Sequence, residues 1–208
     1  MLLQHPFAAI TPTLDGAVLE VLARADAEFT GGQLHRMIPG ASESGVRKAA
    51  KRLVEQGLVL AEQTGPAYRF RLNRDHLLAP AVIDIAHANA QLHTKVRDHV
   101  ATWPTPPDAV VLFGSAARGQ MTAASDLDVL VVAEPNDLLD EAAGQLAQTL
   151  TALTGNDTRI VHMTADEIRD AFERGDNFMT RVVADAQMLY GPPRFLHRLR
   201  TEARQARV

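Results

Sequence analysis

The chain has 208 residues, of which 46% are hydrophobic and 22% are charged, so its composition excludes wholesale disorder and matches an ordinary globular protein. A formal net charge of -4 excludes a general affinity of the whole molecule for polyanions, and the absence of cysteine excludes disulfides and thiolate metal sites. No stretch approaches the roughly 20 apolar residues of a membrane helix. The N-terminal segment also lacks the basic and apolar regions of a signal peptide, so we expect a cytoplasmic protein.

Charge is distributed unevenly along the chain. Residues 30–75 carry eight basic and four acidic side chains, a net charge of +4, whereas residues 1–29 have a net charge of -3 and residues 76–208 of -5. A basic segment inside an acidic chain is a candidate contact for a polyanion. The alternative is a charged helix that is simply solvated.

Apolar residues at helical spacing predict three helices in the basic region and just before it. They fall over residues 14–25, 30–38 and 43–56, with Thr30 and Ser42 as N-caps of the second and third. In the third helix the apolar residues occupy one face and the basic residues the other. This helix therefore presents a positively charged surface to solvent.

Two short alternating segments, LVLAEQ and YRFRLN, follow the third helix and predict a two-stranded hairpin. The order of helices and hairpin over residues 12–74 resembles the winged helix-turn-helix of bacterial regulators. The resemblance implies binding of double-stranded DNA, because a helix fits the major groove and basic side chains reach phosphates and guanine edges. Its candidate contacts are Ser44, Arg47, Lys48 and Lys51 on the helix and Arg69 or Arg71 on the wing. A winged helix used only for protein contact or dimerisation is the alternative.

Residues 76–101 have apolar side chains at mostly helical spacing and predict one long helix in a connector over residues 76–107. A proline-rich segment from Trp103 to Pro107 ends it. Such a helix commonly supports a dimer interface, so a homodimer is a candidate assembly. The connector histidines are not four residues apart, as two metal ligands on one helix face would be: His76, His87, His93 and His99. The predicted boundaries are 1–75 for the winged helix, 76–107 for the connector and 108–208 for the remaining domain.

A short apolar run, AVVLF over residues 109–113, predicts a buried strand that ends at Gly114-Ser115. Ten residues later Asp126-Leu127-Asp128 opens a second apolar run. The whole stretch FGSAARGQMTAASDLDVLVV resembles the signature of the polymerase β-like nucleotidyltransferase superfamily. The combination of strand, Gly-Ser, loop and Asp-Leu-Asp is specific, although a Gly-Ser pair alone is common.

The chemistry that the resemblance implies explains these residue types. Nucleotidyl transfer attacks an α-phosphorus and expels pyrophosphate, and two Mg²⁺ ions roughly 3.5–4 Å apart can neutralise the entering and leaving oxygens. Asp126 and Asp128 lie one residue apart on a strand, so both point to one face and are the candidate catalytic metal ligands. Gly114, Ser115 and Arg118 are the candidate nucleotide-binding residues, aided by a helix that begins just after Ser115.

Members of this superfamily usually place a third carboxylate on a later strand. The corresponding strand here is expected over residues 158–163, after a helix at 138–153, and carries Arg159 at that position. Arginine cannot bind a metal. Asp157 and His162 are the alternative third ligands. The other possibilities are activity through two carboxylates or another base, and a loss or reduction of catalytic competence.

The sequence therefore predicts an α+β protein with a winged helix-turn-helix and a nucleotidyltransferase domain that contains a small mixed sheet. The first hypothesis is Mg²⁺-dependent transfer of a nucleoside monophosphate from an NTP to a hydroxyl of a protein, an RNA or a small molecule. The resemblance includes antitoxin-type members, which favours a protein acceptor. The alternatives are a transcriptional regulator that senses nucleotide without turnover and a purely structural domain. The basic segment 194–208 is expected to form an exposed helix.

Overall fold

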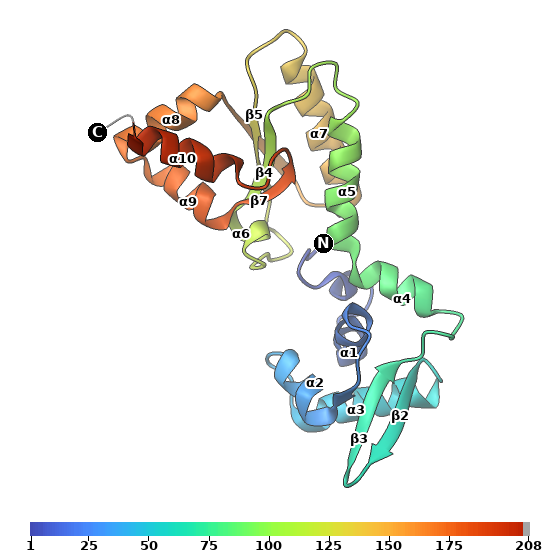
Figure 1. Cartoon of the computed structure of the whole chain (residues 1–208). Helices are drawn as coiled ribbons and strands as arrows, with labels where there is room; N and C mark the ends of the chain where they lie inside the picture. The colour runs from blue at the N-terminus through green and yellow to red at the C-terminus, as the bar shows by residue number, and fades with distance from the viewer. Residues whose placement is uncertain (206–208) are drawn as a thin grey trace. The chain divides into compact units, whose positions relative to one another are not determined.

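The computed structural model describes residues 1–205 and has a mixed α+β architecture with two small sheets (Figure 1). By its internal contacts the chain divides into two compact units, one from Leu2 to Asn89 and one from Ala90 onward that includes Met1. Within residues 1–205, no helix combines the length and the apolar character needed to cross a membrane.

The first unit contains short helices and a three-stranded antiparallel sheet in the order β1-β3-β2. The three predicted helices and the predicted hairpin are all present. In chain order the elements are η1 (Pro6–Ala9), α1 (Leu14–Arg24), β1 (Phe29–Thr30), α2 (Gly31–Met37), α3 (Glu43–Glu55), β2 (Val59–Thr64), β3 (Ala67–Leu72) and α4 (Ala79–Ala86).

Both predicted N-caps are confirmed. The Thr30 hydroxyl accepts a hydrogen bond from the Gln33 backbone N–H at 3.3 Å, and the Gln33 side chain accepts one from the Thr30 N–H at 2.7 Å. The two bonds form a capping box that starts α2. The Ser42 hydroxyl accepts from the Gly45 N–H at 3.1 Å and starts α3.

Helix α3 is amphipathic in the way its sequence predicts. Its apolar side packs into a core built with α1, α2, the hairpin and α4, and the buried α3 residues are Val46, Ala49, Ala50 and Leu53. The basic side chains of Arg47, Lys48 and Lys51 are exposed. Burial of one face therefore fixes the direction in which the charged face points.

The long helix predicted over residues 76–101 is instead two helices. Helix α4 ends at Ala86 and α5 runs over Ala88–Val100, with His87 at the break. The His87 N–H still bonds to the Ile83 carbonyl at 3.1 Å, so the break lies at the very end of α4. Neither proline nor glycine stands near His87, and for this reason the sequence gives no sign of the interruption.

The second unit is built on a four-stranded mixed sheet in the order β6-β5-β4-β7. Strand β4 pairs antiparallel with β5 and β7, and β5 pairs parallel with β6. After α5 the elements are β4 (Ala109–Phe113), α6 (Gly114–Ala117), β5 (Leu127–Val132), α7 (Leu139–Thr154), β6 (Thr158–Met163), α8 (Ala165–Arg174), α9 (Asn177–Asp185), β7 (Gln187–Tyr190) and α10 (Phe195–Gln205).

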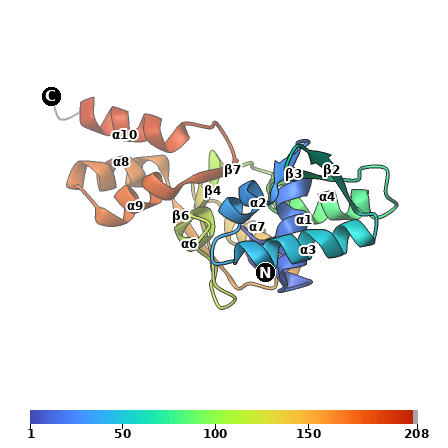
Figure 2. The ribbon, with the colours of Figure 1, turned by 90° about the horizontal axis from the view of Figure 1, so that it is seen from below.

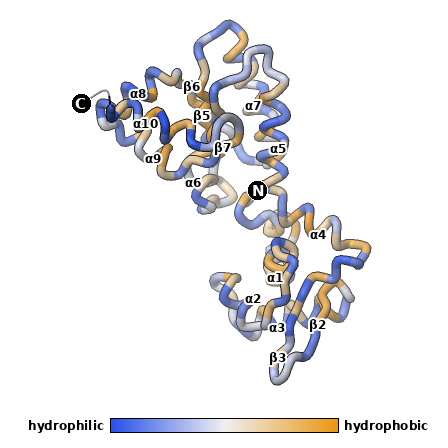
Figure 3. The backbone as a smooth tube through the Cα atoms, in the orientation of Figure 1, coloured by the Kyte–Doolittle hydropathy of each residue, from blue (hydrophilic) through white to orange (hydrophobic). Residues whose placement is uncertain are grey.

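Both faces of the central strands are covered. One face forms a core with α8, α9 and α10, and its strand residues are Ala109, Val111, Leu130 and Val132. Helices α8, α9 and α10 lie together on that side (Figures 1 and 2), while α5 and α7 lie on the other. Hydrophobic residues accordingly follow β5 along its length (Figure 3). A strand buried on both faces reads as an apolar run, and in β5 only the partly exposed Asp128 interrupts that run.

The basic C-terminal segment is not the exposed helix that its sequence predicts. Helix α10 packs on α8 and buries one side, made of Phe195, Leu196, Leu199 and Ala203. Glu202 of α10 pairs with Arg198 of the same helix and with Arg169 of α8, which ties the two helices together. The last three residues of the predicted segment, 206–208, lie outside the described residues.

Candidate active site

The Gly-Ser pair and the two aspartates meet at one edge of the sheet of the second unit. Because β4 and β5 are antiparallel, the end of β4 lies beside the start of β5, and Phe113 is paired with Asp128. Gly114, the next residue, has a φ of +72°, which favours glycine. A Cβ atom on Gly114 would stand 2.6 Å from the Asp128 Oδ2 atom. Glycine is thus required here both by its backbone conformation and by the closeness of the carboxylate.

The single-turn helix α6 follows at once and contains Ser115 in its first turn. It begins at Gly114, one residue before Ser115, rather than just after Ser115 as the sequence predicts. Gly119, with a φ of +66°, turns the chain away, and the Gln120 N–H bonds back to the Ser115 carbonyl at 2.9 Å. The half-buried Ser115 is thereby held at the same sheet edge as Asp128.

The two aspartates are partly exposed, whereas the residues that alternate with them are fully buried. Asp126 immediately precedes β5 and Asp128 lies within it, while Leu127 and Val129 are 0% exposed. Burial raises the pKa of Asp128 above its ordinary value, and the nearby Asp126 carboxylate raises it further. The positive charges of Arg159 and Arg118 oppose this rise. The site therefore holds two close carboxylates whose mutual repulsion a cation would relieve.

Arg159 lies directly beside these carboxylates. In the parallel pairing of β5 and β6 it is the partner of Asp128, so both side chains lie on one face. Its Nη2 atom is 2.7 Å from the Asp126 Oδ2 atom. The Arg159 side chain is 74% exposed and that of Asp126 is 27% exposed, so this ion pair lies at the surface of the site.

Neither alternative third ligand completes a metal cluster. Asp157 precedes β6, and its backbone carbonyl accepts a hydrogen bond from the Leu127 N–H at 2.8 Å. His162 is paired with Val131, on the opposite face from Asp128, and its Nδ1 atom lies 3.6 Å from an Asp140 oxygen. Across residues 1–205, no group of three or more histidine, aspartate or glutamate side chains is clustered to hold a metal ion.

Arg118 is anchored rather than free. Its guanidinium forms an ion pair with Asp185, at the end of α9, and its Nε–H donates to the Gln120 side chain at 3.1 Å. Asp185 stands 67 residues away in the sequence, and no motif marks it as a site residue. The pair holds the turn after α6 against α9 and leaves Arg118 close enough to act electrostatically on Asp128.

Two further contacts that the sequence does not indicate hold the walls of the site. The rings of Phe113 and Phe178 meet edge to face, with centroids 5.7 Å apart. The Gln187 side-chain N–H donates to the Ala117 carbonyl at 2.6 Å and satisfies the end of α6. His93 of α5 is half-buried, and its pKa is lowered by burial and by the charge of Arg97.

The donor set fits a divalent ion only when a bound nucleotide supplies further ligands. Mg²⁺ prefers oxygen and is commonly held by one or two carboxylates together with substrate phosphates and water. Asp126 and Asp128 are two such carboxylates, close to each other and partly exposed. This pair alone, without phosphates, offers too few ligands for a dedicated metal cage.

In the first unit, a groove of about 600 Å³ lies between α3 and the hairpin. It gathers the four candidate DNA contacts of the helix with apolar and aromatic side chains: Ser44, Arg47, Lys48, Lys51, Val54, Ala61, Tyr68 and Phe70. The two wing candidates, Arg69 and Arg71, lie on the other face of the hairpin and do not line the groove. Arg47 and Lys51 pair with glutamates of α3, whereas Lys48 has no ion pair with any residue up to 205.

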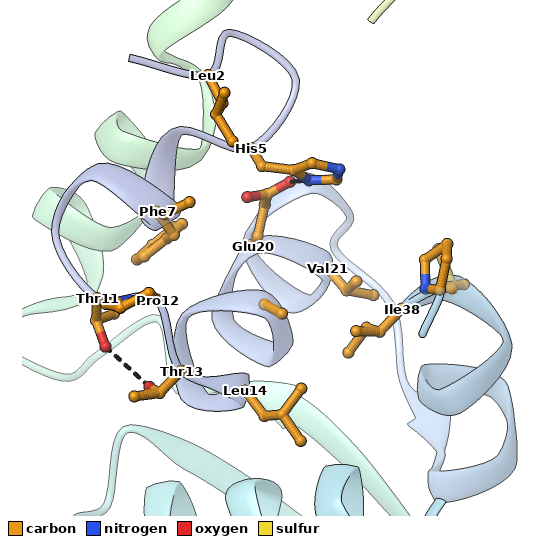
Figure 4. A pocket seen from close by; sticks show the side chains of 14 residues that line it. Leu2, His5, Phe7, Thr11, Pro12, Thr13, Leu14, Glu20, Val21 and Ile38 are labelled. Atoms are coloured by element: carbon orange, nitrogen blue, oxygen red, sulfur yellow. Dashed lines mark hydrogen bonds and ion pairs between the residues drawn. The ribbon is translucent and has the colours of Figure 1, made fainter. Parts of the chain in front are cut away.

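A second cavity in this unit, of about 360 Å³, contains a buried acid (Figure 4). Glu20 of α1 is only 5% exposed, and its carboxylate lies 3.1 Å from a His5 nitrogen and 3.0 Å from an Arg24 nitrogen. The rest of the lining is mostly apolar. No sequence motif marks Glu20. Its contact with His5 joins the N-terminal segment to α1, and its pairing with Arg24 lies within α1.

Comparison with known proteins assigns a class to part of the chain. Residues 94–176 match the family model described as "Nucleotidyltransferase domain". The match includes β4, α6 and β5, and so the Gly-Ser pair and both aspartates. This part of the chain is thus similar to a nucleotidyltransferase domain. The match begins after the first unit ends and leaves that whole unit unassigned.

Solved structures with a similar fold include a toxin-antitoxin with AMP-PNP, which is 22% identical with a TM-score of 0.41 and covers 55% of this chain and 86% of its own. Two mutants of the toxin-antitoxin MntA-HpeT are 20% and 23% identical, with TM-scores of 0.41 and 0.39. They cover 55% of this chain and 86% and 84% of their own chains. No curated protein matches the chain.

Proposed function

We propose that the second unit is a Mg²⁺-dependent nucleotidyltransferase of the polymerase β-like superfamily, which transfers a nucleoside monophosphate from an NTP to a hydroxyl acceptor. One observation carries the proposal: Gly114 and Ser115 stand beside Asp126 and Asp128 at a single sheet edge, inside the segment that matches a nucleotidyltransferase domain. The acceptor class we favour is a protein hydroxyl, with RNA and small molecules as the other candidates.

Each residue has a distinct role in this proposal. Asp126 and Asp128 hold the divalent ion, which supplies positive charge to the phosphate oxygens when it is bound. Gly114 lets the triphosphate approach the backbone, and Ser115 offers its N–H and hydroxyl to phosphate oxygens. Arg118, held by Asp185, adds a fixed positive charge near the same place. The main task of these residues is to place the triphosphate relative to the acceptor.

The test measures NTP binding by calorimetry with and without Mg²⁺, together with pyrophosphate release in the presence of candidate acceptor proteins. Wild type should bind an NTP only with Mg²⁺, and the Asp126→Ala/Asp128→Ala variant should lose this binding. Thr122→Ala, in the exposed loop between the two motifs, is the matched control that should bind normally. Metal-independent binding that survives the double substitution would reject the site.

We also propose that the first unit is a winged helix that binds double-stranded DNA, and that two copies of the chain form a homodimer that reads two half-sites. The supporting observation is the exposed basic face of α3 beside the hairpin. Arg47→Ala with Lys51→Ala should weaken duplex binding at least tenfold at low salt, because two phosphate contacts are lost. Arg36→Ala, an exposed α2 arginine outside the groove, is the control. Unchanged affinity of the double variant would exclude this surface.

A second candidate function is a transcriptional regulator whose nucleotidyltransferase domain senses nucleotide without turnover. The observation that favours it is Arg159, which stands beside Asp126 and Asp128 where a further carboxylate would strengthen metal binding. A sensor should bind an NTP, change its DNA affinity and leave the nucleotide intact. An enzyme should release pyrophosphate and lose this release in Asp128→Ala.

A further inference from the structure

The structure places a cation among the two carboxylates of the proposed metal site. Arg159 is the strand partner of Asp128, and its guanidinium is 2.7 Å from Asp126. We propose that this site takes one divalent ion rather than two, and that the Arg159 guanidinium contacts the triphosphate and supplies the positive charge of the second ion. This inference rests on the proposed function and departs from the two-ion expectation.

The set of protein ligands supports a single ion. Asp126 and Asp128 are the two carboxylates of the site, and Arg159 places a positive charge beside them. Two divalent ions about 4 Å apart repel each other strongly unless anionic ligands offset their charge. Within residues 1–205, no third acidic or histidine side chain is clustered with these two. A second ion would therefore have to share both carboxylates with the first and stand close to the Arg159 guanidinium.

Arg159 is also positioned to move from a carboxylate to a phosphate. Its side chain is 74% exposed, and within the described chain its ion pair is with Asp126 alone. An exposed pair of this kind is weak, so giving it up for a multiply charged phosphate is favourable. A guanidinium binds phosphate through two parallel N–H bonds, a geometry that a lysine lacks.

The other arginine near the site is not available for this role. Arg118 is paired with Asp185 and donates to Gln120, and these contacts hold it at the turn after α6. The two arginines therefore have different roles. Arg159, on β6, is free to move to a phosphate, whereas Arg118, after α6, is held in place. Loss of the Arg159 guanidinium should therefore lower the affinity for nucleotide, and a carboxylate in its place should also raise the number of bound metal ions.

The experiment counts bound Mn²⁺, as a paramagnetic substitute for Mg²⁺, by electron paramagnetic resonance on the full chain with non-hydrolysable analogues of the four NTPs. Wild type should bind one Mn²⁺ per chain with the analogue, and Arg159→Asp should bind two. Arg159→Gln should still bind one, with analogue affinity about tenfold lower, because a charged phosphate contact is lost. Lys95→Asp, which makes the same charge change on exposed α5, should match wild type.

The outcomes separate the two proposals. Two Mn²⁺ ions in wild type, or an unchanged analogue affinity in Arg159→Gln, would overturn the inference and leave the proposed function standing. Binding of no analogue by folded wild type would overturn the proposed function, and the inference with it, whereas loss of binding in folded Arg159→Asp alone would overturn only the inference. Circular dichroism of each variant confirms that the fold is intact.

Discussion

At the scale of single residues, the proposed site depends on a close fit between a glycine and a carboxylate. Gly114 has a backbone conformation that other residues avoid, and the Asp128 side chain fills the space where its Cβ would lie. The geometry explains why the motif begins with glycine. It also means that Gly114 and Asp128 cannot vary independently.

Gly114→Ala should destabilise the second unit by about 1–3 kcal/mol, since it combines a left-handed backbone with a clash against a carboxylate. Metal-dependent nucleotide binding should be lost as Asp128 is displaced. Chemical denaturation and calorimetry measure the two effects. Gly144→Ala is the control, because Gly144 lies in α7 with open space around it and alanine there should be neutral or stabilising. Equal behaviour of the two variants would contradict the argument.

Asp128→Asn should stabilise the protein in the absence of metal by up to about 1 kcal/mol, as substitutions at strained sites often do. The pKa of Asp128 is raised in the folded state, so folding favours its protonated form. Between the ordinary value of 3.8 and the raised pKa, the folded state binds more protons than the unfolded state, and stability falls as pH rises. Above that window the loss of stability caused by the charged Asp128 carboxylate stays constant. Asparagine, which carries no charge, removes this loss.

Urea denaturation of wild type and Asp128→Asn from pH 4 to pH 8 measures this difference. The advantage of the variant should be smallest at the acid end and should grow with pH. The exposed part of the carboxylate is screened by water, which keeps the effect small. If the extra stability of Asp128→Asn over wild type became smaller as the pH rises, the raised pKa of Asp128 in the folded state would be contradicted.

At the scale of secondary structure, α3 depends on its first residue as well as on its buried face. Ser42→Ala removes the hydroxyl that accepts from the Gly45 N–H and should lower the free energy of unfolding of the first unit by about 1 kcal/mol. Ser42→Gly should cost only a few tenths of a kcal/mol. Thermal unfolding followed by circular dichroism compares the two. A larger loss in Ser42→Gly would argue against capping as the cause.

Much of the secondary structure was predictable from the sequence, because helices and strands depend on local patterns of residues. The alternation of apolar and charged residues placed α3 and the hairpin, and a continuous apolar run placed β4 to the residue. Contacts between distant segments had no such signal. The Arg118–Asp185 pair and the Phe113–Phe178 contact join residues more than 60 positions apart, and only the packed sheet brings them together.

Errors at this level also have physical causes. The predicted single helix over residues 76–101 fails at His87, where no helix-breaking residue stands. The prediction that α10 is exposed was based on its arginine content and is wrong. Four apolar residues on one side of the helix are buried instead. Composition averages over a helix, whereas packing depends on the face that each residue occupies.

At the scale of the whole molecule, each unit has a core of its own. One cluster draws all of its buried residues from positions 7 to 86, and another draws all of its from positions 109 to 199. A fragment of residues 1–87, which ends just after α4, should therefore fold alone and unfold cooperatively. Circular dichroism and denaturant unfolding of the fragment provide the measurement, and a random-coil spectrum would refute the expectation.

The antiparallel pairing of β4 and β5 has a consequence for how such a protein can diversify. Gly114 and Asp128 are fixed by the sheet, while the segment between them leaves and returns at the same edge, with Ala123 and Ala124 exposed in a turn. Added residues at that turn cost mainly the slowly growing entropy of a longer loop. The loop is therefore free to acquire new partners through insertion, while the residues proposed to handle the nucleotide stay in register.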